Sequence, residues 1–295
     1  MKKAPFTGSA VALITPFDEN GVDYKKLDEL LEYHIAHKTD AIVVCGTTGE
    51  CSTMNYEEHA GVIAHSVKTV AGRVPVIAGA GSNETTRAVY LAKYAEETGC
   101  DGILVVTPYY NKTTQRGLRE YYTAIAENTS LPIIIYNIPG RTGVKVSIET
   151  FKYLDKIPNI VAVKEATGDL AFAAEIAAET DLVLYSGNDD IIVPIMSLGG
   201  KGVISVVANI LPEETHNICA DFEAGNIEKS RKEFLKYLDL IHALFIEVNP
   251  IPIKTAMNLL GYKVGALRAP LCEMEPENLE KLKISLKNAG LEIKE

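Results

Sequence analysis

Short, continuous apolar runs alternate along most of the chain with segments whose apolar residues recur at helical spacing. Apolar runs of this length are typical of strands covered on both faces, as in a parallel sheet. The pattern predicts strands at Val11–Thr15, Ala41–Cys45, Val76–Ala80, Gly102–Thr107, Ile133–Asn137, Ile160–Glu165, Leu182–Ser186 and Gly202–Val207. Amphipathic helices are predicted between them, for example at Asp23–His37, Tyr56–Val70, Glu84–Thr98 and Leu118–Glu127, with candidate N-caps at Asp23, Asn55, Asn83 and Ser147.

The alternation of strands and helices favours an α/β fold built from parallel βαβ units. Eight such units in about 210 residues predict a (β/α)8 TIM barrel. A doubly wound open sheet is the competing topology, and it would normally show a glycine-rich phosphate turn after its first strand. Here the first strand is followed by Pro16-Phe-Asp18, so the barrel is favoured.

Only helical periodicity remains after Val207, in segments at Pro212–Glu223, Ile227–Val248, Ile253–Leu260 and Pro276–Asn288. Asn249-Pro-Ile-Pro252 marks a break between two of these helices, because proline lacks an amide hydrogen. No change in composition typical of a linker precedes the tail. We therefore expect a catalytic barrel at residues 1–225 and a C-terminal helical extension at residues 226–295, packed on the barrel or against another subunit.

The chain has 295 residues, 47% of them hydrophobic and 23% charged, with a formal net charge of −10. Because no run is rich in lysine and arginine, we expect no nucleic acid and no membrane as a partner. The five cysteines form no C-x-x-C motif, which argues for a reducing compartment and against a disulfide framework or a zinc site. The apolar run near the N-terminus is too short for a secretory signal, and no run is long enough to span a bilayer, so we expect a cytoplasmic protein.

One strand, Ile160–Glu165, contains a lysine within its apolar run. A buried ammonium is costly unless it is paired or loses its proton. Lys164 therefore has two interpretations. It is either a desolvated amine that attacks a carbonyl and forms a Schiff base, or a strand-end lysine that reaches solvent or pairs with Glu165.

Polar motifs follow several predicted strands, at the barrel end where catalytic residues of this fold gather. Gly46-Thr-Thr-Gly-Glu50 offers N–H and O–H donors for a carboxylate, or else forms a tight turn with helix-capping threonines. Thr107-Pro-Tyr-Tyr-Asn111 presents two tyrosines that either donate a hydroxyl or cover the rim. Tyr136-Asn-Ile-Pro-Gly-Arg-Thr-Gly143 combines a proton carrier with an arginine that either clamps a carboxylate or lies on the surface. Ser186-Gly-Asn-Asp-Asp190 is compatible with close substrate approach or with ordinary turn chemistry.

Metal and nucleotide motifs are not apparent. The histidines and carboxylates show no metal-ligand spacing, and His34, His37, His59 and His65 are predicted to face solvent on helices. The sequence has no P-loop, no G-x-S-x-G and no dinucleotide fingerprint. We expect neither a metal nor an organic cofactor.

Together, the motifs beginning at Gly46, Tyr109 and Tyr136, with Val161-Ala-Val-Lys-Glu165, resemble the 4-hydroxy-tetrahydrodipicolinate synthase (dihydrodipicolinate synthase) family. That family belongs to the pyruvate-dependent class I aldolases, which include N-acetylneuraminate lyase. The resemblance extends over essentially the whole chain, with the motifs in order at the strand ends. Arg141 matches the synthase pattern, because neuraminate lyases usually lack an arginine there.

The resemblance implies a lyase of the diaminopimelate route to L-lysine. Lys164 would form a Schiff base with pyruvate, and the resulting enamine would add to the aldehyde of L-aspartate 4-semialdehyde before cyclisation. Tyr136 would carry protons through Thr47 and through Tyr110 of a neighbouring subunit. Further roles are implied for Thr48 on the pyruvate carboxylate, Arg141 on the semialdehyde carboxylate, and Gly187 and Ile204 at the pocket floor.

The resemblance also implies a homotetramer built from two tight dimers, with an effector site for lysine at the dimer interface in many members. The residues that correspond to that site form a degenerate set: Cys51, Ser52, Tyr56, His59, Asn83, Arg87 and Tyr109. Tyr56 stands where regulated bacterial members often have histidine, and Arg87 where they have glutamate. A cation in place of that anion repels the lysine ammonium, so we expect weak or absent feedback by lysine.

Two other functions remain compatible with the sequence. One is a related aldolase with a sugar-derived aldehyde acceptor, of the N-acetylneuraminate lyase type. The other is a non-catalytic ligand sensor on the same barrel, because a fold alone does not determine function. The presence of both the amine of Lys164 and the hydroxyl relay argues against the sensor.

Overall fold

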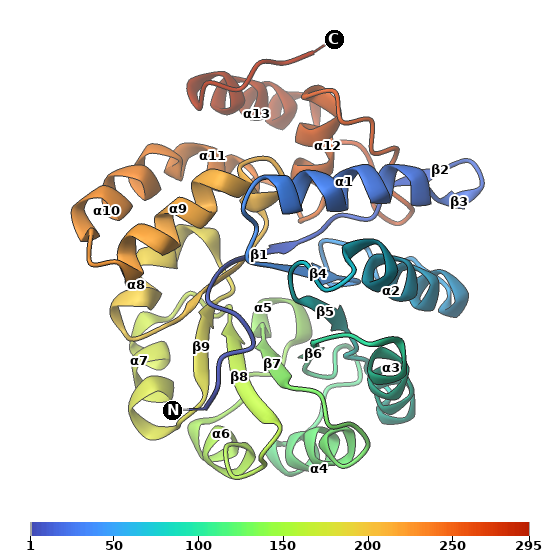
Figure 1. The fold of residues 1–295 in the computed structure, drawn as a ribbon, viewed down its shortest axis with the longest axis vertical. Helices are drawn as coiled ribbons and strands as arrows, with labels where there is room; N and C mark the ends of the chain where they lie inside the picture. The colour runs from blue at the N-terminus through green and yellow to red at the C-terminus, as the bar shows by residue number, and fades with distance from the viewer. Residues whose placement is uncertain (1, 295) are drawn as a thin grey trace.

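Eight parallel strands close into a barrel in the computed structural model, which describes residues 2–294 (Figure 1). Each strand pairs with the next, and the last pairs with the first, so the predicted barrel is confirmed and the open sheet is excluded. The strands are β1 (Gly8–Ala12), β4 (Ala41–Val44), β5 (Val76–Gly79), β6 (Gly102–Val106), β7 (Ile133–Asn137), β8 (Ile160–Glu165), β9 (Val183–Ser186) and β10 (Gly202–Ser205).

Helices surround the barrel on its outer face (Figure 1). They are α1 (Tyr24–Ala36), α2 (Tyr56–Val70), α3 (Thr85–Thr98), α4 (Gln115–Ala126), α6 (Ile148–Leu154), α7 (Leu170–Glu179), α8 (Ile192–Ser197) and α9 (Pro212–Glu223), and the short α5 (Pro139–Thr142) directly follows β7 at the end of the barrel. Asp23, Asn55 and Ser147 cap their helices through side-chain oxygens, as predicted. The predicted cap at Asn83 is wrong, because α3 begins one residue later, after Glu84, whose side chain makes no capping bond.

The first strand begins earlier than the apolar pattern indicates. Gly8 and Ser9 belong to β1 although they are not apolar, and the amide of Ser9 donates to Asp40 at 2.7 Å. The apolar residues after Ala12 lie beyond the strand, and the chain then forms a small hairpin of β2 (Phe17–Asp18) and β3 (Gly21–Val22). Short 3-10 turns, η1 (Asp189–Ile191) and η2 (Val207–Asn209), follow β9 and β10.

The C-terminal extension consists of α10 (Ile227–Lys236), α11 (Leu238–Ala243), α12 (Ile251–Leu259) and α13 (Pro276–Asn288). The prediction of one helix over Ile227–Val248 is wrong, because α10 ends at Lys236 and the chain after α11 is irregular. In Figure 1 the extension lies beside α9 and α1, and α13 packs on α11 and α12. The division between residues 225 and 226 stays a prediction, and α10 packs directly on α9 across it.

Two histidines that were predicted to face solvent are buried. His34 pairs with Thr39 Oγ1 at 2.9 Å, and burial lowers its pKa to about 3. His59 Nε2 pairs with the carbonyl of Gly79 at 2.8 Å, and burial also lowers its pKa. Both side chains lie between a helix and the barrel, because the apolar stripe of a helix is wide enough to include a histidine that has one polar partner.

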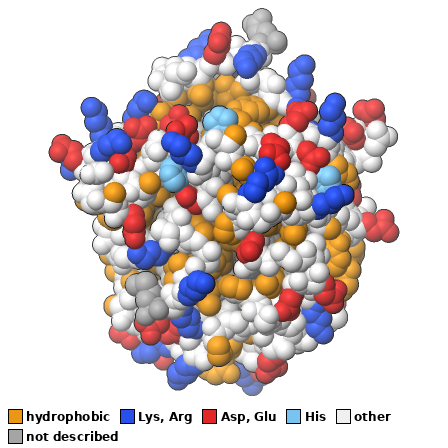
Figure 2. Space-filling model, in the orientation of Figure 1, with side chains coloured by type: hydrophobic (Ala, Val, Ile, Leu, Met, Phe, Trp, Pro, Cys, Tyr) orange, Lys and Arg blue, Asp and Glu red, His pale blue; other side chains and the backbone are white. Residues whose placement is uncertain are grey.

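The surface mixes both signs of charge on the face shown in Figure 2. Within residues 2–294, no helix is long and apolar enough to cross a membrane. The same residues contain no group of three or more histidine, cysteine, aspartate or glutamate side chains that could hold a metal ion. An open cavity of about 1040 Å³ lies between α12 and α13, near the apolar area at the top of Figure 2.

Candidate active site

Lys164 and Tyr136 are direct neighbours inside the barrel. They are register partners on the adjacent strands β8 and β7. Lys164 Nζ lies 4.1 Å from the centroid of the Tyr136 ring, and the two residues are 5% and 6% exposed. Because side chains alternate along a strand, Lys164 and Ala162 share the inward face while Glu165 lies on the opposite face.

Glu165 is not the partner of Lys164. Its carboxylate accepts hydrogen bonds from Asn137 Nδ2 at 2.8 Å and from the amide of Thr167 at 2.7 Å. Burial raises the pKa of Glu165, and these hydrogen bonds oppose the shift. No ion pair found among the described side chains involves Lys164. Lys164 is therefore a buried amine without a carboxylate held against it, which is the arrangement a nucleophilic lysine requires.

A second buried carboxylate, Asp189, lies near Lys164. Its Oδ2 accepts from the amides of Val206 and Val207, each at 2.9 Å, and so joins the loops that follow β9 and β10. Burial raises the pKa of Asp189, and hydrogen bonds from Val207, Ser205 and Val206 oppose that rise, with a smaller contribution from Lys164. The sequence analysis interpreted this segment through Gly187, as a site of close substrate approach or an ordinary turn, and nothing in its spacing indicated that Asp189 would be buried.

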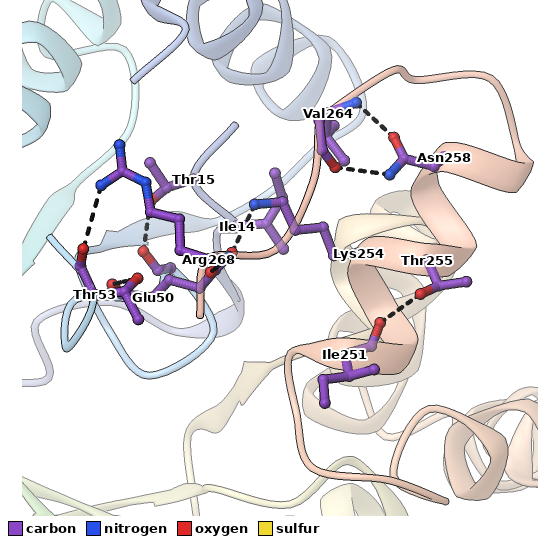
Figure 3. A network of polar contacts seen from close by, with 12 residues as sticks. Ile14, Thr15, Glu50, Thr53, Ile251, Lys254, Thr255, Asn258, Val264 and Arg268 are labelled. Carbon is purple, nitrogen blue, oxygen red and sulfur yellow. Dashed lines mark hydrogen bonds and ion pairs between the residues drawn. The ribbon is translucent and has the colours of Figure 1, made fainter. Parts of the chain in front are cut away.

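The loop Gly46–Glu50 is held by contacts with the C-terminal extension (Figure 3). Lys254 Nζ lies 2.6 Å from Glu50 Oε1, and both side chains are almost completely buried. Glu50 Oε2 accepts from the amide of Arg268 at 3.1 Å, and Thr15 Oγ1 donates to the carbonyl of Gly49 at 2.6 Å. The threonines of this loop do not cap α2, because Asn55 does.

Asn249 connects two candidate substrate-binding residues that lie far apart in the sequence. Its Nδ2 donates to Thr48 Oγ1 at 3.0 Å, and its carbonyl accepts from Arg141 Nη2 at 2.8 Å. Arg141 itself is exposed and lies on α5. Sequence reasoning recognised Asn249 only as part of a proline-containing break and missed this contact.

The other candidate residues lie on neighbouring strand ends. Gly187 donates its amide to the carbonyl of Glu165 at 2.7 Å, and a Cβ at this position would lie 2.6 Å from Cβ of Ala166. Ile204 is buried on the inner face of β10 with Tyr136 in the same apolar cluster. The backbone carbonyl of Thr47 accepts a hydrogen bond from the amide of Glu50 within the same loop.

Tyr110 is not packed within its own chain. It is 91% exposed and has a φ of 68°, in the left-handed region that non-glycine residues rarely adopt. Strain of this kind persists where a residue is held for a particular contact, and it is typical of functional sites. Tyr110 makes no hydrogen bond or ring contact with Tyr136 or Thr47 of the same chain.

Only some of the candidate effector residues lie together on the surface. The Arg87 guanidinium lies 4.1 Å from the centroid of the exposed Tyr56 ring. Burial raises the pKa of the Cys51 thiol to about 11, and the nearby Arg87 charge opposes that rise. The Asn83 carbonyl accepts from Asn111 Nδ2 at 2.9 Å. His59 is buried against Gly79, as described above. Ser52 and Tyr109 lie in the loops after β4 and β6.

A closed (β/α)8 barrel with a buried lysine beside a tyrosine is the arrangement used by the class I aldolase type of lyase, in which the lysine amine reacts with a carbonyl. The model of the dihydrodipicolinate synthetase family matches residues 5–289. This chain belongs to that family.

Curated relatives and solved structures agree with this assignment. The 4-hydroxy-tetrahydrodipicolinate synthase of Caldicellulosiruptor bescii is 58% identical over 292 residues, covering 98% of this chain and 99% of the relative. That of Acetivibrio thermocellus is 56% identical and covers 99% of this chain and all of the relative. The crystal structure of dihydrodipicolinate synthase from Aquifex aeolicus has a TM-score of 0.96 at 48% identity, and covers 98% of this chain and all of the other.

Proposed function

We propose that this protein condenses pyruvate with L-aspartate 4-semialdehyde, the reaction of a 4-hydroxy-tetrahydrodipicolinate synthase, in the diaminopimelate route to L-lysine. The observation that supports it best is Lys164, a buried amine 4.1 Å from the Tyr136 ring and free of a carboxylate partner among the described residues. Relatives more than half identical over nearly the whole chain have this activity in their names.

The chemistry follows from the lysine amine. Lys164 Nζ adds to the keto carbon of pyruvate and water leaves, which forms an iminium ion that draws electrons from the methyl group. A methyl proton is lost, and the enamine carbon bonds to the aldehyde carbon while the aldehyde oxygen gains a proton. The amine of the acceptor then attacks the former keto carbon, and the bond to Lys164 breaks as its nitrogen regains a proton. Because the iminium ion serves as the electron sink, the proposed reaction needs neither a metal nor an organic cofactor.

Proton transfer is assigned to hydroxyl groups. Tyr136, beside Lys164, carries protons to and from the reacting carbon and oxygen atoms, and Thr47 extends the path. Tyr110 completes the path from a second copy of the chain, because in its own chain it is almost fully exposed. Thr48 holds the pyruvate carboxylate and Arg141 the acceptor carboxylate.

We further propose a homotetramer of two dimers in the cytoplasm. The left-handed, exposed Tyr110 and the exposed rings of Tyr56 and Tyr90 support a face that a second copy covers. One solved relative, with a TM-score of 0.94 and 41% identity, is described as a monomeric variant. The number of subunits in this protein is therefore the quantity to measure. Sedimentation velocity should give a tetramer, and Tyr110→Phe should lower turnover without changing the sedimentation coefficient.

Feedback by lysine is proposed to be weak or absent. The Arg87 guanidinium stacks on Tyr56 and places a positive charge where a lysine effector would bring its ammonium. A solved relative from Cyanidioschyzon merolae, 41% identical, has lysine bound. Millimolar lysine should leave the rate of this protein nearly unchanged, and a halved rate contradicts the proposal.

The first test follows pyruvate consumption with a panel of aldehydes: L-aspartate 4-semialdehyde, N-acetylmannosamine and glyceraldehyde. Consumption with the semialdehyde alone supports the proposal, and consumption with a sugar aldehyde assigns the protein to the neuraminate lyase type. Lys164→Ala should abolish turnover and prevent borohydride from trapping pyruvate on the protein. Activity within a factor of about ten of wild type would contradict the Schiff-base role.

A further inference from the structure

The N-terminal segment of residues 2–8, in dark blue in Figure 1, runs across the end of the barrel at which the strands begin. Lys2 Nζ donates to the carbonyl of Ile160, the first residue of β8, at 2.5 Å. The amide of Gly8 donates to the carbonyl of Lys201, directly before β10, at 2.8 Å. The segment is therefore tied to the strand that carries the candidate nucleophile and to a strand beyond it.

Phe6 of this segment stacks on Tyr185 of β9. The two ring centroids are 4.3 Å apart, the ring planes are 10° from parallel, and the residues are 6% and 0% exposed. Tyr185 Oη donates to the carbonyl of Phe6 at 2.5 Å and accepts from the amide of Phe6 at 3.3 Å. Both residues belong to the apolar cluster inside the barrel, together with Tyr136 and Ile204. The stacked pair therefore fills the floor of the barrel, and the hydroxyl fixes it to the backbone of the N-terminal segment.

Tyr185 is also a direct neighbour of Lys164. The two are register partners on β9 and β8, and side chains of such partners point to the same face of strands that lie about 4.8 Å apart. Because Tyr136 is the partner on the other side, Lys164 stands between two tyrosines. The hydroxyl of Tyr185 is used in both directions by Phe6, and burial raises its pKa, so it is not available as a proton carrier.

We propose that Phe6 and Tyr185 are positioning residues for the Schiff-base step, because together they close the barrel beneath Lys164 and hold its amine in the orientation that attacks pyruvate. This inference rests on the proposed function. A lysine amine ends a flexible four-carbon stem, and its reaction requires a particular distance and angle to the carbonyl carbon. A floor filled by close-packed rings removes the space into which the stem would otherwise turn, and it keeps water from the amine.

Three variants separate positioning from stability. Phe6→Ala opens a cavity beside Tyr185, because a core collapses only partly around a deleted side chain. Tyr185→Phe keeps both rings and removes only the two hydrogen bonds to the N-terminal segment. Phe151→Ala is the matched control. Phe151 is also completely buried, but it lies on α6, in the layer between the helices and the outer face of the barrel.

The experiment mixes each protein with pyruvate alone and quenches with borohydride at increasing times, so that mass spectrometry gives the rate at which the covalent adduct forms. Phe6→Ala should slow this rate by about 10-fold or more, because small misplacements of reacting groups are costly. Tyr185→Phe should slow it by about 3-fold, since its ring stays in place but is held less firmly. Phe151→Ala should unfold at a lower urea concentration and form the adduct at the wild-type rate.

Steady-state kinetics give a second readout that a purely structural role would not produce. In Phe6→Ala, kcat/KM for pyruvate should fall in parallel with the rate of adduct formation. The ratio kcat/KM for L-aspartate 4-semialdehyde should stay within about 2-fold of wild type, because it starts from the adduct already formed. Phe6→Leu, which refills most of the cavity, should recover most of the rate.

Equal slowing in Phe6→Ala and Phe151→Ala overturns the inference, because it means that any loss of core packing has this effect. Equal losses of kcat/KM for the two substrates overturn it as well. If Phe6→Ala does not fold, as judged by circular dichroism, Tyr185→Phe decides, and a wild-type rate of adduct formation in that variant overturns the inference. Wild-type protein separates this result from the proposed function. If borohydride traps no pyruvate on wild-type Lys164, the proposed function itself is wrong, and this inference fails with it.

Discussion

Substitution of Lys254 by methionine tests how firmly the extension holds the Gly46–Glu50 loop. Lys254 Nζ and Glu50 Oε1 are 2.6 Å apart, and the two side chains are 1% and 0% exposed. Burial lowers the pKa of Lys254, and the negative charge of Glu50 opposes that shift. Methionine keeps most of the apolar stem but removes the charge, so Glu50 is left with the amide of Arg268 as its remaining partner.

The expected cost is large because one charge stays buried without its counter-charge. Removing one partner of a buried ion pair typically costs about 3–5 kcal/mol. A whole domain is stable by only about 5–15 kcal/mol, so Lys254→Met should unfold at a clearly lower urea concentration. The double variant Lys254→Met/Glu50→Gln should recover much of the loss, since a neutral amide is cheaper to bury than a carboxylate.

Urea denaturation followed by circular dichroism at pH 7, at one protein concentration, measures the free energy of unfolding of each variant. Lys38→Met is the matched control. Lys38 and Glu213 are also 2.6 Å apart, but their side chains are 56% and 43% exposed, so its cost should be about 0–1 kcal/mol. If Lys254→Met costs no more than the control, or if the double variant equals the sum of the single variants, the reasoning is refuted.

Tyr136→Phe should lower kcat by about 10²-fold through loss of a proton carrier while borohydride still traps pyruvate, and near wild-type kcat would contradict the assignment. Arg141→Ala should raise the KM for the semialdehyde far more than that for pyruvate, and equal increases in steady-state assays would argue against the clamp. Burial lowers the pKa of His34 from 6.5 to about 3, so its stabilisation is complete above pH 6.5 and is lost as the pH falls. That loss reaches up to about 1.4 kcal/mol per pH unit. His34→Asn should flatten the fall in unfolding free energy below pH 6.5, and an unchanged slope in urea titrations would exclude His34 as its cause.

Local patterns predicted the strands and most helices because each depends on residues close in sequence. Strand β8 and its lysine are examples, since an apolar run with one charged residue is visible without any tertiary contact. The same patterns failed where a polar side chain is buried by distant residues. His34 appeared to be a surface residue because its burial depends on packing around α1. Ser9 was left out of the predicted strand because it is polar, and its place in β1 depends on pairing with the distant Val203 of β10.

By itself, the sequence determined the eightfold repeat of strand and helix, the buried lysine and the motifs at the strand ends. Closure of the barrel then decided which of those residues meet. It placed Lys164 beside Tyr136, and it excluded Glu165 as the lysine's partner because side chains alternate across a strand. Only the tertiary structure revealed that Asn249 contacts Thr48, 201 residues earlier in the chain. Spacing along a single sequence has no information about a contact at that separation, because it arises from the packing of whole elements.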